Sequence, residues 1–253
     1  MNTTQKIVST LCGARRFVAF GLVFAGGIVS GKEVAPSNVE TKVVSHVYNG
    51  YARMKLADGS YQPETYVFAN GGTFDGEPVA GDTISFNEVA RIVRTALKGQ
   101  NFLSTNDPQA TQQMIVLWYG TTRRTVDKPT AYELIDDQNA RILGFQKEMS
   151  RASDLSFTSF AHDFYDEFRA GRYFVVLKAY DFQMAQKEKR LKLLWESRFS
   201  VQRQAVGFAD QLPAMARFAA RTFGRETKGI LDPDAIKGDV KLGELKIIGP
   251  ESR

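Results

Sequence analysis

Cysteine and histidine are scarce in this 253-residue chain. The single cysteine, Cys12, lies in an N-terminal segment that we expect to be removed. The mature chain would then have no disulfide, no thiol nucleophile and no cysteine-ligated metal. The two histidines, His46 and His162, are too few to form a metal site by themselves, because such a site needs three or four ligands. We therefore predict no cofactor.

The chain also lacks an apolar run long enough to span a bilayer. The run from Phe17 to Val29 is shorter than the roughly 20 residues of a transmembrane helix, and glycines interrupt it. Basic residues precede this run, and the small stretch Val29–Gly31 follows it. Positive, then apolar, then small is the pattern of a secretory signal. We expect residues 1–31 to be a signal peptide, a periplasmic or secreted location, and no membrane span in the mature chain; the alternative is a retained N-terminal anchor.

A strong excess of positive charge is missing from the rest of the chain. Lys6, Arg15 and Arg16 account for three of the five net positive charges, so the residues after the signal segment carry only +2. Nucleic-acid recognition requires a basic face. We therefore expect no nucleic-acid partner.

Apolar periodicity predicts a mixture of helices and strands. The clearest helix follows Ser85, with apolar residues three or four positions apart and Glu88 placed to complete a capping box. The Asn70-Gly71-Gly72 sequence is typical of a turn and is expected to end a strand. Further helices are expected at 130–148, 157–169 and 207–223, and strands at 43–47, 65–69, 114–119, 172–183, 192–202 and 244–248.

Two late strands define the expected fold class. Residues 172–183 and 192–202 are joined by the charged segment Gln186–Arg190, which is typical of a solvated turn in an antiparallel hairpin. A hairpin mixed with helices predicts an α+β fold, with a mixed, partly antiparallel sheet, helices packed on it, and a helix after the hairpin. We expect an N-terminal extension at 32–63, a single domain at 64–226 and a C-terminal tail at 227–253.

The strongest candidate for chemistry is the pair His162 and Asp166. On a helix, residues four apart share a face, so this imidazole and carboxylate could hold a metal. The polar side of an amphipathic helix, with Phe160, Phe164 and Phe168 facing inward, explains the same residues. The pair is therefore a weak metal candidate, and no catalytic or cofactor-binding residue is predicted.

Five stretches between about residues 66 and 223 carry a resemblance to known proteins: Phe86–Leu97, Gln109–Gly120, Val175–Asp181, Leu193–Glu196 and Phe208–Phe223. Together they resemble a family of uncharacterised bacterial cell-envelope proteins, many of them lipoprotein-like. The resemblance implies an envelope location and no known enzymatic activity, and it carries over no functional residue. The chain departs from the family because it lacks a lipid-attachment cysteine and has a long helical stretch at 130–169.

Three functions remain open from the sequence. The first is a non-enzymatic binding or assembly accessory module for an unknown envelope protein or ligand, which would show an exposed apolar patch or an unpaired sheet edge. The second is a secreted hydrolase that uses His162 or His46, which would place a histidine in a cleft beside a nucleophile or metal. The third is a carrier of a small apolar ligand or lipid, which would show an apolar cavity of roughly 300 Å³ or more.

Overall fold

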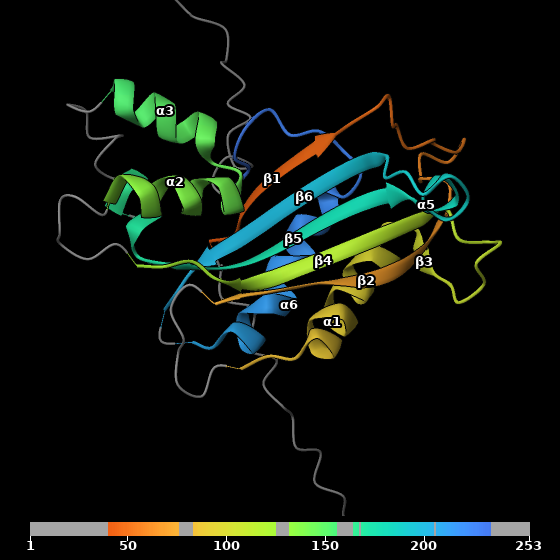
Figure 1. Cartoon of the computed structure of the whole chain (residues 1–253), viewed down its shortest axis with the longest axis horizontal. Helices are drawn as coiled ribbons and strands as arrows, with labels where there is room; N and C mark the ends of the chain where they lie inside the picture. The colour runs from red at the N-terminus through yellow and green to blue at the C-terminus, as the bar shows by residue number, and fades with distance from the viewer. Residues whose placement is uncertain are drawn as a thin grey trace, which may run out of the picture. The chain divides into compact units, whose positions relative to one another are not determined.

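The computed structural model describes residues 40–75, 83–124, 132–155, 164–166, 168–204 and 206–233. The expected signal peptide, most of the expected helix 157–169 and the expected strand 244–248 lie outside these ranges. The described residues form one mixed sheet with helices packed on it (Figure 1).

The sheet contains six strands in the order β1-β6-β5-β4-β2-β3. The pairs β1/β6, β6/β5 and β5/β4 are antiparallel, whereas β4/β2 and β2/β3 are parallel. The predicted α+β class and the predicted late hairpin are therefore confirmed. The strands are β1 (Lys42–Val47), β2 (Glu64–Asp75), β3 (Phe102–Ser104), β4 (Gln113–Thr121), β5 (Arg172–Asp181) and β6 (Leu193–Gln202).

One face of the sheet forms the main core with α1 (Phe86–Lys98), α6 (Phe208–Ala219) and the short η1 (Ala220–Thr222). Helix α1 begins as predicted, because Ser85 and Glu88 form both hydrogen bonds of the capping box. Aromatic rings fill this core: Trp195 stacks on Phe223 with ring centroids 6.0 Å apart.

The other face is covered at one end by α2 (Tyr132–Leu143) and α3 (Gln146–Asp154). The sequence predicted one helix here, but Gly144 adopts a left-handed φ of 79° and separates two. An ion pair holds α2 on the sheet. Arg198 bonds to the buried Glu196 and donates to the carbonyl oxygens of Arg141 and Ile142 in the last turn of α2.

The second strand differs from its prediction. Asn70-Gly71-Gly72 does not end β2, which runs through it with a bulge against β4. The reason is tertiary, because the indole ring of Trp118 lies over Gly71. A Cβ atom at Gly71 would lie 2.3 Å from that ring. The glycine thus provides a close approach between neighbouring strands.

The folded unit also extends beyond the expected 64–226 boundaries. Strand β1, from the expected extension, pairs with β6 along its whole length. Leu231, from the expected tail, forms an antiparallel bridge with Val43. Two short elements were not predicted, β3 and α5 (Phe182–Glu188), which lies between β5 and β6.

Candidate binding site at one end of the sheet

An arginine–glutamate pair is buried at the end of the sheet where β2 and β4 begin. The side chains of Arg53 and Glu64 are 1% and 17% exposed, and Arg53 Nε lies 3.3 Å from Glu64 Oε1. Arg53 Nη2 donates to the carbonyl oxygen of Gln100 at 2.7 Å. The guanidinium lies 4.3 Å from the ring centroid of Tyr61 and 4.0 Å from that of Phe102. These partners replace part of the water that a buried cation loses, although Arg53 Nη1 is buried without a hydrogen-bond partner in the described residues.

Hydrogen bonds extend this pair into the main core. The Tyr51 hydroxyl donates to Glu64, with its oxygen 2.9 Å from Oε2. Gln113 Nε2 also donates to Glu64, and Gln113 Oε1 accepts from Trp195 Nε1 at 2.9 Å. Trp195 is fully buried, so the chain of bonds ties the loop before β2 to the centre of the molecule. We call Tyr51, Arg53, Glu64, Gln113 and Trp195 the buried network.

The electrostatics of the buried network favour a positioning role over proton transfer. Burial raises the pKa of Tyr51 well above its ordinary value, and the charge of Glu64 raises it further. The hydroxyl therefore stays protonated at neutral pH and acts as a donor. The Glu64 carboxylate accepts from Tyr51, Arg53 and Gln113 together, which leaves it poorly placed to act as a base or nucleophile.

A cavity of about 290 Å³ opens beside the buried network. This volume is at the small end of the range for ligand pockets, so it suits a single side chain or small polar group better than an extended ligand. The cavity brings the loop before β2 next to the connection between β5 and β6. Its lining residues are Tyr51, Ala52, Met54, Gln62, Pro63, Glu64, Gln112, Gln113, Asp181 and Leu194.

Large apolar side chains are exposed on the two loops around this cavity. Met54 is 66%, Leu56 43% and Leu191 66% exposed. Met54 follows the buried Arg53 directly, and a backbone bond from the N–H of Leu56 to the oxygen of Ser60 (2.8 Å) closes the hairpin that carries both. The exposed side chains are thus held on an ordered loop rather than on a loose one. We call Met54, Leu56 and Leu191 the rim.

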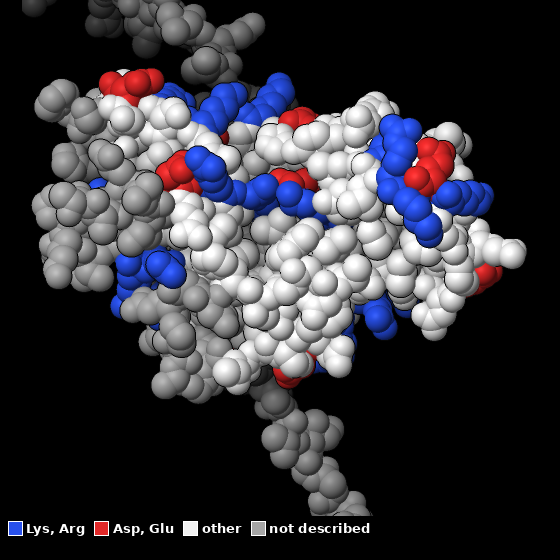
Figure 2. All heavy atoms as spheres, viewed as in Figure 1, with Lys and Arg blue, Asp and Glu red and all other residues white. Residues whose placement is uncertain are grey.

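Basic side chains flank the rim. Lys187, Lys189 and Arg190 are exposed at the end of α5, directly before Leu191, and Lys55 separates Met54 from Leu56. Figure 2 shows this basic cluster around a carboxylate at the end of the molecule where α5 lies. The predicted solvated turn at Gln186–Arg190 is therefore exposed, although part of it is helical.

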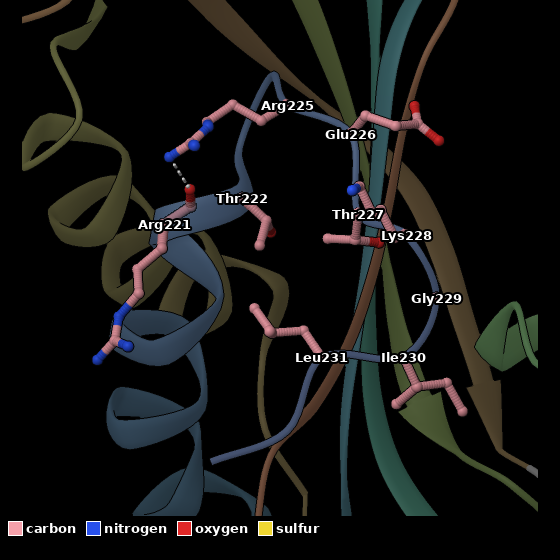
Figure 3. A pocket seen from close by; sticks show the side chains of 9 residues that line it. All are labelled: Arg221, Thr222, Arg225, Glu226, Thr227, Lys228, Gly229, Ile230 and Leu231. Atoms are coloured by element: carbon pink, nitrogen blue, oxygen red, sulfur yellow. Dashed lines mark hydrogen bonds between the residues drawn. The ribbon is translucent and has the colours of Figure 1, made fainter. Parts of the chain in front are cut away.

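His46 lies away from this site, on the outer edge of β1. Its Nδ1 lies 2.8 Å from Glu226 Oε1, and both side chains are about half exposed, at 43% and 51%. Glu226 begins a segment, residues 226–231, that runs along β1 and that we call the strap. Together with η1 and Arg225, the strap lines an open cavity of about 430 Å³, into which Thr222 and Leu231 point (Figure 3).

The strap satisfies the outward backbone donors of β1. The N–H of Val43 donates to the carbonyl oxygen of Leu231 at 2.8 Å, that of Ser45 to Thr227 Oγ1 at 3.0 Å, and that of Val47 to Glu226 Oε2 at 2.8 Å. An unprotected edge strand invites pairing with another chain. His46 therefore helps to hold an edge cover, and its partner Glu226 also lines the cavity beside the strap.

The structure describes only one of the two weak metal candidates. His162 lies outside the described residues, and Asp166 is exposed. Within the same ranges, no three His, Cys, Asp or Glu side chains are close enough to hold a metal ion. No helix of the described part is long and apolar enough to cross a membrane.

A third cavity, of about 520 Å³, lies between α1 and α6. It is an open groove whose lining combines apolar residues with polar ones; the apolar residues include Ile92, Ala96, Pro213 and Ala216, and the polar ones include Thr95 and Arg217. The aromatic side chains expected to line a carrier pocket pack against one another instead, as Tyr173 does with Phe208 at 5.0 Å.

Sequence reasoning missed both the buried network and the rim. Bonded members of the network are up to 82 residues apart in sequence, as in the bond from Trp195 to Gln113, so no local pattern reveals it. A signal for the rim does exist: Met54 and Leu56 alternate with the charged residues Arg53 and Lys55, and the Asp58-Gly59 turn signal follows directly.

Comparisons with known proteins give weak structural resemblances to bacterial proteins. The PelC dodecamer from Paraburkholderia phytofirmans is 9% identical, with a TM-score of 0.33, over 74% of this chain and 99% of that one. A PDZ domain protein from Parabacteroides distasonis is 10% identical, with a TM-score of 0.38, over 76% of this chain and 38% of that one. A DUF4136 family protein from Bacteroides thetaiotaomicron is 8% identical, with a TM-score of 0.33, over 76% of this chain and 100% of that one.

No family model matches the chain, and no curated protein matches its sequence.

Proposed function

We propose that this chain is an exported, non-enzymatic protein that binds another component of the bacterial cell envelope through the rim. The observation that carries the proposal is the pairing of the rim with the buried network. Arg53 is buried between exposed neighbours, and its bonds fix the hairpin that presents Met54 and Leu56 to solvent.

Burying the Arg53–Glu64 ion pair beneath a loop carries a desolvation cost. Replacing such a pair by apolar residues is often neutral or stabilising, so its presence contributes little to stability as such. Fixing an exposed apolar loop has a clear benefit for binding, because a preordered surface loses less conformational entropy when its partner arrives.

The N-terminal sequence supports the location. The basic, apolar and small regions of residues 1–31 follow the order of a secretory signal. The cell envelope is the compartment that such a signal serves in a bacterium.

The test has two measurements on the chain produced in its host. We expect mass spectrometry to find a mature N-terminus near residue 32. We also expect a photo-crosslinking residue at Leu191 to form a discrete adduct in the envelope fraction, and the same residue at Val206, which is 48% exposed and follows the opposite end of β6, to form none. An intact N-terminus in the cytoplasm, or equal crosslinking at the two positions, would contradict the proposal.

A further inference from the structure

We infer that the component bound by the rim is an anionic lipid surface; this inference rests on the proposed function. It starts from the alternation of side chains at the rim. On the hairpin, Lys55 stands between two exposed apolar residues, and on the neighbouring loop three cations lead directly into Leu191.

This arrangement fits the boundary between lipid headgroups and acyl chains. Apolar side chains at a loop tip can enter that boundary, while lysine and arginine remain at the level of the phosphates. Each basic residue near an anionic membrane contributes about a fivefold gain in affinity. The surface is not purely basic, since Glu188 lies 3.6 Å from Arg190 and Asp58 is exposed on the hairpin. The four cations still outnumber these two carboxylates.

A protein partner fits the same surface less well. A stable protein interface buries about 800 Å² on each side, with a contiguous apolar centre from which charged residues are depleted. The rim instead offers three separated apolar side chains with cations between them. Insertion into a headgroup layer needs no contiguous apolar centre.

The geometry of the two loops supports joint insertion. Met54 and Leu194 line one cavity, and the side chain of Asn49 donates to the carbonyl oxygen of Leu193 at 2.8 Å, so the hairpin loop and the start of β6 are in contact. Both loops lie at the same end of the sheet in Figure 1. A flat surface can therefore reach both at once.

The experiment places an environment-sensitive fluorophore at single positions of the mature chain, purified from its host after export, which is expected to contain no native thiol because Cys12 lies in the removed segment. The labelled variants are M54C and L191C, with V206C as the control. Each is mixed with vesicles of equal parts phosphatidylcholine and phosphatidylglycerol, and with vesicles of phosphatidylcholine alone. We expect a blue shift and a severalfold intensity gain at positions 54 and 191 with the anionic vesicles only, and no change at 206.

Variants that remove exposed charges provide a second test, because they leave the core unchanged and a loss of vesicle binding then does not reflect unfolding. The triple variant K187Q, K189Q and R190Q should weaken vesicle binding on the order of a hundredfold, because three contributions of about fivefold are lost. The matched variant R91Q, K147Q and R217Q, which removes three exposed cations elsewhere, should change it by less than about threefold. Equal effects of the two triple variants would overturn the inference.

The outcomes separate the two proposals. A signal at 206 as large as at 54, or binding to neutral vesicles as tight as to anionic ones, would overturn the lipid inference. Silence at 54 and 191 with vesicles, together with one protein crosslinked at Leu191 in cells, would show that the lipid inference is wrong and that the binding function stands. If neither the vesicle fluorescence nor the crosslinking in cells gave a signal, both the lipid inference and the proposed binding function would be wrong.

Discussion

At the scale of single residues, Gln113 connects the loop before β2 to the main core. Its amide nitrogen donates to Glu64, and its amide oxygen accepts from Trp195 at 2.9 Å. Gln113 itself is 1% exposed, so water does not replace these bonds when they are lost. A buried donor left without its acceptor costs about 1–3 kcal/mol.

We therefore predict that Gln113→Leu lowers the free energy of unfolding by about 2 kcal/mol, measured by urea denaturation. Gln109→Leu, at an exposed position shortly before β4, is the matched control and should change it by less than about 0.5 kcal/mol. Equal effects of the two variants would mean that the network does not hold the loop to the core.

Residue-scale packing also explains where sequence reasoning succeeds and fails. The capping box at Ser85 and Glu88 is local, so the start of α1 was predictable. The role of Gly71 depends on Trp118, which is far along the chain, and a turn was predicted there in error. The buried network also depends on tertiary contacts, because the folded sheet is what brings Tyr51 and Glu64 together with Trp195.

At the scale of elements, the strap protects β1 through a carboxylate that is sensitive to acid. Partial burial raises the pKa of Glu226, but the hydrogen bonds from His46 and from the N–H of Val47, with the charge of His46, hold it below its ordinary value. A carboxyl group with a lowered pKa in the folded state stabilises the fold above its ordinary pKa. This stabilisation disappears as the pH falls through the folded-state value.

The difference in unfolding free energy between the native chain and Glu226→Gln should therefore be fully present above the ordinary pKa of a glutamate carboxyl. It should shrink as the pH is lowered through the depressed folded-state pKa of Glu226, because protonated Glu226 resembles glutamine. Urea denaturation at a series of pH values measures it, and the comparison cancels the titration of groups shared by both chains. A difference that is constant over this range would show that the Glu226 carboxylate does not hold the strap.

Element boundaries show which signals the sequence carries. Long amphipathic elements such as α1 and α6 were predictable from apolar spacing, and β4 from its apolar run. The elements that escaped prediction, β3 and α5, have three and seven residues and too few apolar positions to show a period.

At the scale of the whole molecule, the two ends of the sheet differ. One end is covered by α2 and α3, whose apolar residues pack on Val44 of β1 and on Phe174 and Val176 of β5. The other end presents the rim, the basic side chains of α5 and the cavity beside the buried network. This difference gives the described domain one end suited to contact with a second component. It could not be predicted from the sequence, because it depends on which loops the sheet brings together.

Envelope association of rim variants tests this account most directly. Met54→Ser, Leu56→Ser and Leu191→Ser together remove the exposed apolar side chains, and each change alone should alter stability by no more than about 0.5 kcal/mol, because surface substitutions are usually that mild. The control is Leu155→Ser with Val206→Ser, at positions 39% and 48% exposed outside the rim. After cell fractionation, we predict that the rim variant is exported but released from the envelope fraction, while the control variant remains there. Retention of the rim variant at the level of the native chain would contradict the account.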